Sequence, residues 1–323
     1  MSADAVSNDQ APNGGQAPNG QAPEEFRSYY GQPVIKEPTW KVPDVPAYLY
    51  LGGMAGASAT MAVLAELTDR PELARNGRIA AAAGSTASVV ALIHDLGRPM
   101  RFLNMLRVFK PTSPLSVGSW ILAPFSGLTG ASAASALTGW YPLLGRLSAG
   151  AAGILAPAMT TYTAVLLADT AVPGWHEAYR ELPFVFAGSA ISSAGAVAML
   201  TTPTGQTGPA RRMAIAGSAL ELAAERRMEH TAGMVGEVYR TGRPGRVLRA
   251  ARALTWAGAA VSVFAGRHRA IGAVAGLCLS AAGAATRYGI FEAGRVSARD
   301  PRYTVVPQRQ RLAEKEQDAQ KSG

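Results

Sequence analysis

Eight apolar segments, most of them about as long as a bilayer is thick, dominate the sequence from residue 47 onward. About 20 residues of α-helix cross a hydrocarbon core about 30 Å thick. The longest stretch between segments, about 226–250, is too small for a separate soluble domain. The sequence therefore predicts an all-α membrane protein, a bundle of about eight transmembrane helices. The expected helices are 47–67, 77–97, 118–140, 147–169, 183–202, 210–225, 251–267 and 270–290.

Composition and charge agree with a location in lipid. Only 16% of the residues are charged, whereas a soluble domain has about 25%. The 35 glycines suit membrane helices, which approach closely through small residues. The net charge of +9 is of a kind found in nucleic-acid-binding proteins, but the basic residues lie in loops between apolar segments. We therefore expect membrane lipid and no nucleic acid as a partner.

The two ends of the chain differ from its apolar centre. Residues 1–28 are rich in Asn, Gln, Pro, Gly and Ala, and we expect them to be disordered because they have too little apolar surface to fold. Residues 29–46 contain aromatic residues and prolines, which predict an extended arm lying on a surface. The transmembrane domain is expected at 47–302, and 303–323 form a polar C-terminal tail.

Segment 210–225 is less apolar than its neighbours, because it contains Glu221 and Glu225. It either crosses the membrane or lies at the interface. With eight crossings, most of the 31 Lys and Arg residues fall on the side of the N-terminus. Without this helix, the Arg-rich loop and the Arg-rich C-terminal tail would lie on opposite sides. Because basic loops stay in the cytoplasm, we expect eight crossings and both termini in the cytoplasm, in the inner membrane of a bacterium.

Two pairs of glycines have the spacing of helix-contact motifs. Gly52 and Gly56 lie in the first predicted helix, and Gly272 and Gly276 lie in the last. Such pairs let two helices approach closely, either in a dimer or within one bundle. In a chain of about eight helices, we expect the contacts to be intramolecular.

Ionisable side chains in the apolar segments are candidates for function, because a charge in lipid is costly unless it is paired. The densest group, at the end of segment 77–97, is His94, Asp95 and Arg98. Histidine titrates near neutral pH, the acid can orient it, and the arginine can keep the acid ionised. The group can therefore bind and protonate a polar ligand at the membrane edge. The alternative interpretation is a helix end, closed by an Asp–Arg pair and Gly97.

Other polar residues extend this set of candidates. Tyr162 and Asp169 lie in the half of segment 147–169 that is predicted to face the cytoplasm, as does the end of segment 77–97. Glu66 lies near the opposite surface, and with Glu221 it is a candidate for a proton path. For Glu66, the alternative is a side chain that extends to the interface.

The sequence argues against haem and against an iron–sulfur cluster in this chain. A haem held by two histidines needs both of them at membrane depth on facing helices. Of the four histidines, His176, His230 and His268 fall in predicted loops, which leaves only His94. A cluster needs about four thiolates, and Cys278 is the single cysteine. No cluster of His, Cys and carboxylates has metal-ligand spacing, so we also expect no metal site.

Residues 94–120, HDLGRPMRFLNMLRVFKPTSPLSVGSW, resemble the signature segment of the NrfD/polysulfide-reductase family of integral membrane subunits. Three further segments fit the same family in the same order. They are YLYLGGMAGASAT at 48–60, TYTAVLLADTAVPGWHE at 161–177 and RYGIFEAGRVSARDP at 287–301. The resemblance thus covers most of the chain from residue 47 to about 301.

This resemblance implies a haem-free anchor that binds quinone or quinol in a multi-subunit oxidoreductase. A four-cluster, ferredoxin-like iron–sulfur subunit would dock on one membrane face and carry electrons between the quinone and a molybdopterin catalytic subunit. The chain would own no redox centre and would act only within the complex. Its Ala/Arg/Gly-rich composition suggests a high-GC bacterium and so favours menaquinone.

The matched segments also imply roles for individual residues. His94 or Asp95 would exchange a proton with a quinone carbonyl, and Tyr162 would donate a hydrogen bond to it. Arg98 would support the site electrostatically. Asp169 is a candidate ligand because its half of segment 147–169 is predicted on the same face as the end of segment 77–97.

Three basic residues after the signature histidine, Arg101, Arg107 and Lys110, would contribute to a docking surface for the partner; the alternative is ordinary positive loop charge. In several family members the catalytic subunits face the periplasm, whereas the His94 group is predicted on the cytoplasmic side. Either the partners here are cytoplasmic or the group is structural. The rival function is a haem-free scaffold or proton-conducting subunit that binds no quinone.

Overall fold

The computed structural model describes residues 34–98 and 100–322, and this part of the chain contains helices and turns but no strand. The prediction of an all-α bundle of about eight helices is confirmed. The long helices are α1 (Asp44–Leu67), α2 (Pro71–Leu96), α4 (Pro114–Thr138), α5 (Pro142–Ala168), α7 (Leu182–Thr201), α8 (Gly208–Thr231), α9 (Gly242–Phe264) and α10 (Arg269–Arg299). The shorter elements and the last helix are α3 (Met100–Met105), α6 (Pro173–His176), η1 (Thr204–Gln206), η2 (Gly233–Tyr239) and α11 (Arg302–Ser322).

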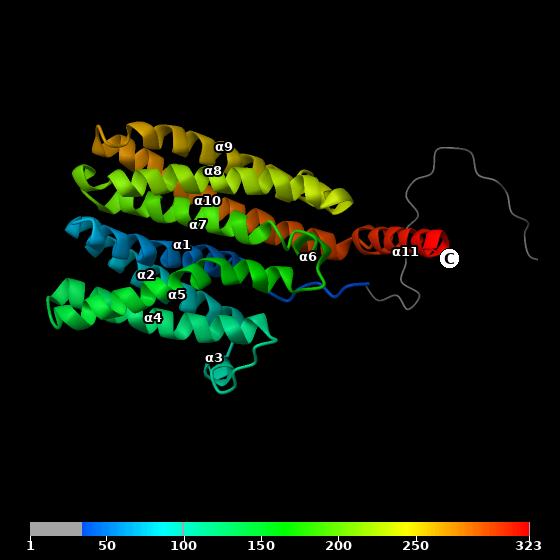
Figure 1. Ribbon diagram of the computed structural model, residues 1–323, viewed down its shortest axis with the longest axis horizontal. Coiled ribbons are helices and arrows are strands. Elements are labelled where there is room, and N and C mark those ends of the chain that lie inside the picture. Colours follow the sequence, from blue (N-terminus) through cyan, green and yellow to red (C-terminus); the bar gives the residue numbers. More distant parts are fainter. Residues whose placement is uncertain (1–33, 99, 323) are drawn as a thin grey trace, which may run out of the picture.

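The long helices form two groups of four that lie side by side (Figure 1). The first group contains α1, α2, α4 and α5, and the second contains α7 to α10. Within each group, helices that follow one another in the chain pack as antiparallel pairs, because the turns between them are short. Helices α1 and α7 pack against each other and join the two groups.

The bundle has two ends, which we call the N-terminal face and the opposite face. The N-terminal face carries the start of α1 together with α3, α6, η2 and α11 (Figure 1). The opposite face carries the short turns 68–70, 139–141, 202–207 and 265–268.

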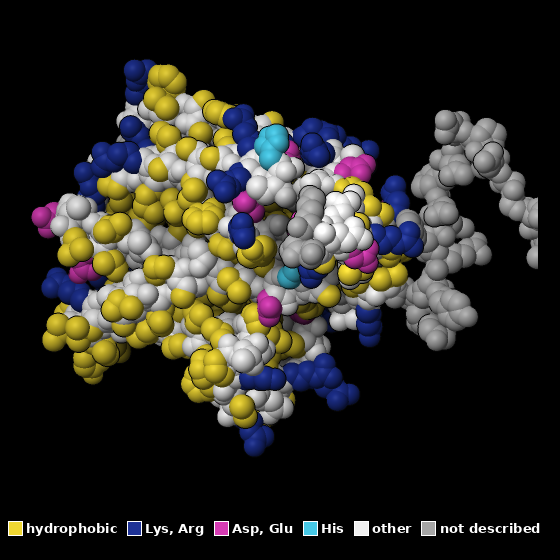
Figure 2. Space-filling view, turned by 45° about the vertical axis from the view of Figure 1, so that its right-hand side comes forward, with side chains coloured by type: hydrophobic (Ala, Val, Ile, Leu, Met, Phe, Trp, Pro, Cys, Tyr) yellow, Lys and Arg dark blue, Asp and Glu magenta, His cyan; other side chains and the backbone are white. Residues whose placement is uncertain are grey.

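Six helices of the described chain, α1, α2, α5, α7, α9 and α10, are long and apolar enough to cross a membrane. Helix α4 is rich in Ser, Gly and Thr, and α8 carries several charges, so neither belongs to this set. Large apolar side chains lie exposed on the outside of the bundle, for example Ile154, Leu147 and Leu277. Figure 2 shows such side chains along the helices, with many Lys and Arg near the helix ends. These features identify a multi-pass membrane protein.

Helix α8 lies within the bundle, as the prediction of eight helices requires. It packs along α7 at a very close distance through two glycines. A Cβ atom on Gly188 would lie 2.4 Å from the backbone nitrogen of Glu221, and one on Gly217 would lie 2.5 Å from that of Ser192. Glu221 and Glu225 are both buried. The alternative of a helix lying at the interface is therefore wrong.

Several helices are longer than predicted. Helix α2 starts at Pro71, α8 continues to Thr231, and α10 continues to Arg299. The apolar segments stop at the first charged residues, whereas a helix continues wherever its charged side chains find partners or reach water. For the same reason, most of the predicted loop 226–250 is helical, and 44–46 form the first turn of α1 rather than the end of an arm.

Both glycine motifs make contacts within the chain, as expected. A Cβ atom on Gly56 would lie 2.9 Å from the carbonyl oxygen of Ala156 in α5. One on Gly276 would lie 2.8 Å from the carbonyl oxygen of Ala196 in α7. These glycines allow α1 and α5, and α10 and α7, to approach closely.

Residues 34–43 contain no helix and lie on the N-terminal face; the predicted arm residues 29–33 and the tail 1–28 lie outside the described part. Trp40 stacks on Trp175 with ring centroids 5.5 Å apart. The carboxylate of Glu37 accepts hydrogen bonds from Arg299 (2.7 Å) and Arg295 (2.8 Å) near the end of α10. Aromatic contacts of Trp40 with Trp175 and Phe291, the Glu37 ion pairs and hydrogen bonds of Lys41 to the end of α2 thus attach this segment to the bundle.

The Glu37 cluster predicts that attachment of residues 34–43 depends on pH. Hydrogen bonds from Arg299 and Arg295 lower the pKa of the Glu37 carboxyl below its ordinary value of 4.5. A lowered pKa stabilises the attached state above the ordinary value, and this stabilisation is lost as the pH falls through the lowered pKa. We expect the Trp40 fluorescence, measured as the difference between wild type and Trp40→Phe, to change below about pH 4 to 5. The Glu37→Gln variant should show no such transition, and an equal transition there would contradict the assignment.

Candidate functional site

The end of α2 is tied to α1 and to the residues before it. His94 is exposed, and its Nδ1 lies 2.7 Å from Oδ2 of Asp44, the first residue of α1. Oδ1 of Asp95 accepts a hydrogen bond from the backbone N–H of Lys41 at 2.8 Å. The ammonium group of Lys41 in turn donates to the carbonyl oxygen of His94 at 3.3 Å. The imidazole therefore has an acidic partner, but that partner is Asp44 rather than its neighbour Asp95.

Tyr162 lies buried in α5, where its hydroxyl group hydrogen-bonds to that of Tyr48 in α1. The two rings meet edge to face, with centroids 6.3 Å apart. Helix α4 leaves room for this arrangement, because a Cβ atom on Gly118 would lie 2.5 Å from the Tyr162 ring. The pair belongs to the main apolar core, which also contains Phe125 and Met159.

Asp44 and Tyr48 stand four residues apart on α1, so their side chains lie on the same face of the helix, one turn from each other. His94, Asp44, Tyr48 and Tyr162 consequently form a row of polar groups, which we call the polar row. It leads from the exposed N-terminal face into the core of the first helix group. Residues four apart on a helix have Cβ atoms about 5 to 6 Å from each other, so Asp44 and Tyr48 are neighbours along the row. Such a row can move a proton between water and a buried acceptor.

Sequence reasoning missed Asp44 and Tyr48. Their spacing is a signal that could have found them, because residues four apart share a helix face. The predicted start of the helix at residue 47 left Asp44 in the arm and concealed this relation.

The structure separates the other predicted ligands from this row. Arg98 is exposed. Asp95 and Arg98 are both described, and they form no ion pair with each other, so the expected pair is wrong. Gly97 ends α2 with a φ of 69°, as the sequence suggested. Asp169 is exposed at the end of α5 and is not brought into contact with Tyr162.

A second polar cluster lies in the other helix group. Glu221 of α8 and Arg287 of α10 are each 1% exposed. Thr286 donates a hydrogen bond to Oε1 of Glu221 at 2.8 Å. The Arg287 guanidinium donates to the carbonyl oxygen of Phe186 at 2.7 Å and lies 3.7 Å from the centre of its ring. Sequence reasoning did not single out Arg287, although the residue lies within the predicted helix 270–290. An arginine inside an apolar segment is a signal that could have found it.

This second cluster continues toward the N-terminal face. Glu225, one turn beyond Glu221, lies 3.3 Å from Nε of Arg252 in α9. Arg252 also forms an ion pair with Glu229, one further turn along α8. Three acids of α8 thus form a line along one helix, with arginines from its neighbours.

Glu66 does not join Glu221, since it lies in the first helix group, at the opposite face. Its carboxylate pairs with Arg78 of α2 and, at 3.2 Å, with Arg146 of α5. The two residues that were predicted as one proton path therefore belong to different clusters.

The three predicted docking residues, Arg101, Arg107 and Lys110, are all exposed. They lie on α3 and the loop after it, which project sideways from the bundle, below α4 in Figure 1 and near the N-terminal face. Met100 and Phe109, also exposed, add apolar surface to the same projection.

No curated protein sequence matches the chain significantly. The family model for polysulphide reductase, NrfD, matches residues 35–212. The matched part contains the whole polar row and the docking residues, whereas the resembling segment at 287–301 lies beyond it. Because this match covers more than half of the chain, the protein belongs to the NrfD family of polysulphide-reductase membrane subunits.

Proposed function

We propose that this protein is the quinone- or quinol-binding anchor of a multi-subunit oxidoreductase. The observation that carries the proposal is the polar row from His94 through Asp44 to Tyr48 and Tyr162. It joins an exposed, titratable imidazole to two buried hydroxyl groups in a protein of the NrfD family.

The chemistry of quinones fits this row. Reduction of a quinone consumes protons as well as electrons, so a quinone in the membrane needs a proton route from water. His94 is exposed and can take protons from water, and Asp44 orients its ring. Tyr48 and Tyr162 can donate hydrogen bonds to a carbonyl oxygen, while the apolar side chains around them suit the ring. The quinone supplies the redox chemistry, and menaquinone remains our preferred type.

The residues that flank this row have supporting roles. Asp95 fixes the end of α2 through the backbone of Lys41 and so positions the His94 ring. Arg98 and Asp169, both exposed on the same face, adjust the local potential at the entrance.

The partner docks on the N-terminal face in this proposal. Exposed Arg101, Arg107 and Lys110 provide positive charge on a projecting element, which suits the acidic side of a four-cluster iron–sulfur subunit. That subunit would connect the quinone to a molybdopterin catalytic subunit. Since basic loops stay in the cytoplasm, the N-terminal face and both termini are cytoplasmic, in the inner membrane of a bacterium.

A second candidate function is proton conduction without quinone binding. The buried acids Glu221 and Glu225, with Arg287 beside them, favour it, because ionisable groups inside a membrane protein mark ion and proton pathways. Glu66 takes no part in this route, because it lies in the other helix group and pairs with Arg78 and Arg146.

Purification from the native membrane in mild detergent, followed by mass spectrometry and analysis for iron, molybdenum, tungsten and quinone, tests the proposal. We expect an iron–sulfur protein, a molybdopterin enzyme and quinone to co-purify. A sample with neither partner nor quinone would overturn the anchor function. The same sample in liposomes that contain a pH-sensitive dye tests the second candidate, which requires proton flux without any quinone present.

A further inference from the structure

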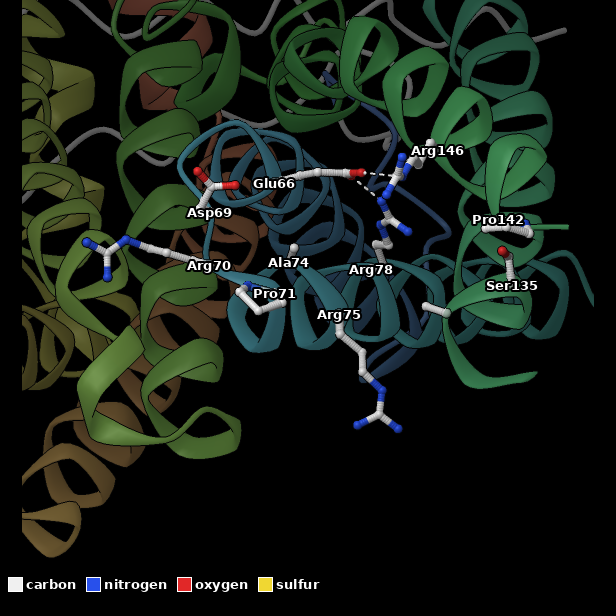
Figure 3. Close-up of a pocket in the computed structure, with 11 residues that line it drawn as sticks. Glu66, Asp69, Arg70, Pro71, Ala74, Arg75, Arg78, Ser135, Pro142 and Arg146 are labelled. Carbon is white, nitrogen blue, oxygen red and sulfur yellow. Dashed lines mark hydrogen bonds and ion pairs between the residues drawn. The ribbon is translucent and has the colours of Figure 1, made fainter. Parts of the chain in front are cut away.

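A large pocket opens at the opposite face, far from the polar row (Figure 3). It has a volume of about 650 Å³ and lies between the α1–α2 turn and the α4–α5 turn. This volume is within the usual range for a small-molecule site, about 300 to 1,000 Å³. Its charged lining residues are Glu66, Asp69, Arg70, Arg75, Arg78 and Arg146.

The pocket has an excess of positive charge that its own acids do not neutralise. Arg78 and Arg146 approach Glu66 from α2 and α5, whereas Arg75 extends away from this group (Figure 3). Arg75 is exposed and makes no ion pair in the described chain. A guanidinium has five N–H donors, so one carboxylate leaves donors of Arg78 and Arg146 available to an anion. Arginine is also the side chain that best matches phosphate in geometry.

The surroundings of the pocket are those of a membrane–water interface. Trp140 and Tyr141, in the turn before α5, are 72% and 75% exposed. Aromatic residues of this kind gather at the level of lipid head groups. Directly after them, Leu143, Leu144 and Leu147 are exposed on α5, beside the pocket residue Arg146. An anion held here would therefore have an apolar surface next to it.

We propose that this pocket binds the phosphate head group of an anionic phospholipid from the bilayer. The arginines bind the phosphate, and the leucines at the start of α5 contact the acyl chains. Basic pockets between transmembrane helices recognise anionic head groups in this way. The apolar surface favours a lipid over free phosphate, because acyl chains that cover the leucines bring their own head group next to the arginines.

The bound lipid also explains why Glu66 lies in a group of arginines. With Arg78 only 12% exposed and Arg146 70% exposed, Glu66 holds one inner and one outer arginine in place at the pocket wall. In this view Glu66 positions the arginines and is not a proton carrier.

Native mass spectrometry of the purified protein in nanodiscs tests the proposal. The nanodiscs contain equal amounts of phosphatidylglycerol and phosphatidylcholine, and the measurement is the ratio of the two lipids that remain bound. We expect wild type to retain phosphatidylglycerol preferentially. The double variant Arg75→Gln/Arg146→Gln, which changes exposed side chains, should lower this preference about tenfold. Arg267→Gln is the matched control, because Arg267 is an exposed arginine on the same face but outside the pocket.

Several outcomes would overturn the proposal. An equal preference in wild type and the double variant would exclude the pocket. An equal loss in Arg267→Gln would show that general surface charge attracts the lipid. Titration of the detergent-solubilised protein with inorganic phosphate separates the two sources of phosphate. If phosphate raises the melting temperature as much as phosphatidylglycerol at the same concentration, the site is one for free phosphate and the lipid assignment is wrong.

Discussion

Replacing His94 by glutamine is expected to lower quinone-dependent turnover of the assembled complex about 100-fold, while activity with an artificial dye is retained. A positioned proton donor or acceptor contributes about 100- to 10,000-fold to a reaction, and His94 is the titratable group at the exposed end of the polar row. Dye reduction requires only the partner subunits, so it should not change. The measurement is a pair of steady-state assays on the same purified complex.

His176 provides a matched control for this experiment. It is also exposed on the N-terminal face, where its Nδ1 lies 3.1 Å from the carbonyl oxygen of Ala168, and it takes no part in the polar row. The His176→Gln complex should keep both activities. Addition of imidazole should restore part of the quinone activity of His94→Gln, since a small buffer can replace an exposed proton carrier. Loss of dye activity together with quinone activity would indicate an assembly defect and contradict the assigned role.

A substitution at the inner end of the polar row also tests whether the row supplies protons to the quinone. Tyr162→Phe removes the buried hydroxyl group that hydrogen-bonds to Tyr48. Its effect should equal that of His94→Gln, about 100-fold, but imidazole should not restore activity, because the core is closed to buffer. Restoration to the same extent in both variants would argue against a row that leads inward.

The second large effect is expected at Gly188, where α7 and α8 meet. Alanine there would place its Cβ atom 2.4 Å from the backbone nitrogen of Glu221 and 2.8 Å from the carbonyl oxygen of Gly217. Backbone atoms cannot relieve such a clash by changing rotamer, as a flexible side chain can, so α7 and α8 must move apart. Overpacking of this kind costs about 1 to 3 kcal/mol. We expect a melting temperature several degrees below that of wild type, measured by intrinsic fluorescence in detergent.

Gly127 in α4 is the matched control, because a Cβ atom there would meet nothing within 4 Å. Gly127→Ala should leave the melting temperature unchanged or raise it slightly, since alanine favours a helix over glycine by about 1 kcal/mol. An equal decrease in both variants would mean that glycine itself, and not the approach of α7 and α8, stabilises the protein.

The sequence by itself determined the helices and their order. In lipid every backbone N–H and C=O must be satisfied within its own segment, so a long apolar stretch has to be a helix. The same reasoning led to the group at the end of α2, because a histidine and an aspartate at a membrane edge are conspicuous in an apolar chain. It could not set the ends of the helices, since α10 continues past its apolar part to Arg299.

Only the tertiary structure decided which polar residues meet. Asp44 and His94 are 50 residues apart, and Tyr48 and Tyr162 are 114 apart. Which side chains come together depends on how each helix is rotated about its axis, and small residues such as Gly118 and Gly188 set that rotation through close packing. Local spacing contains no information about such contacts. For this reason the sequence predicted an Asp95–Arg98 pair, whereas packing gave His94 a partner on α1.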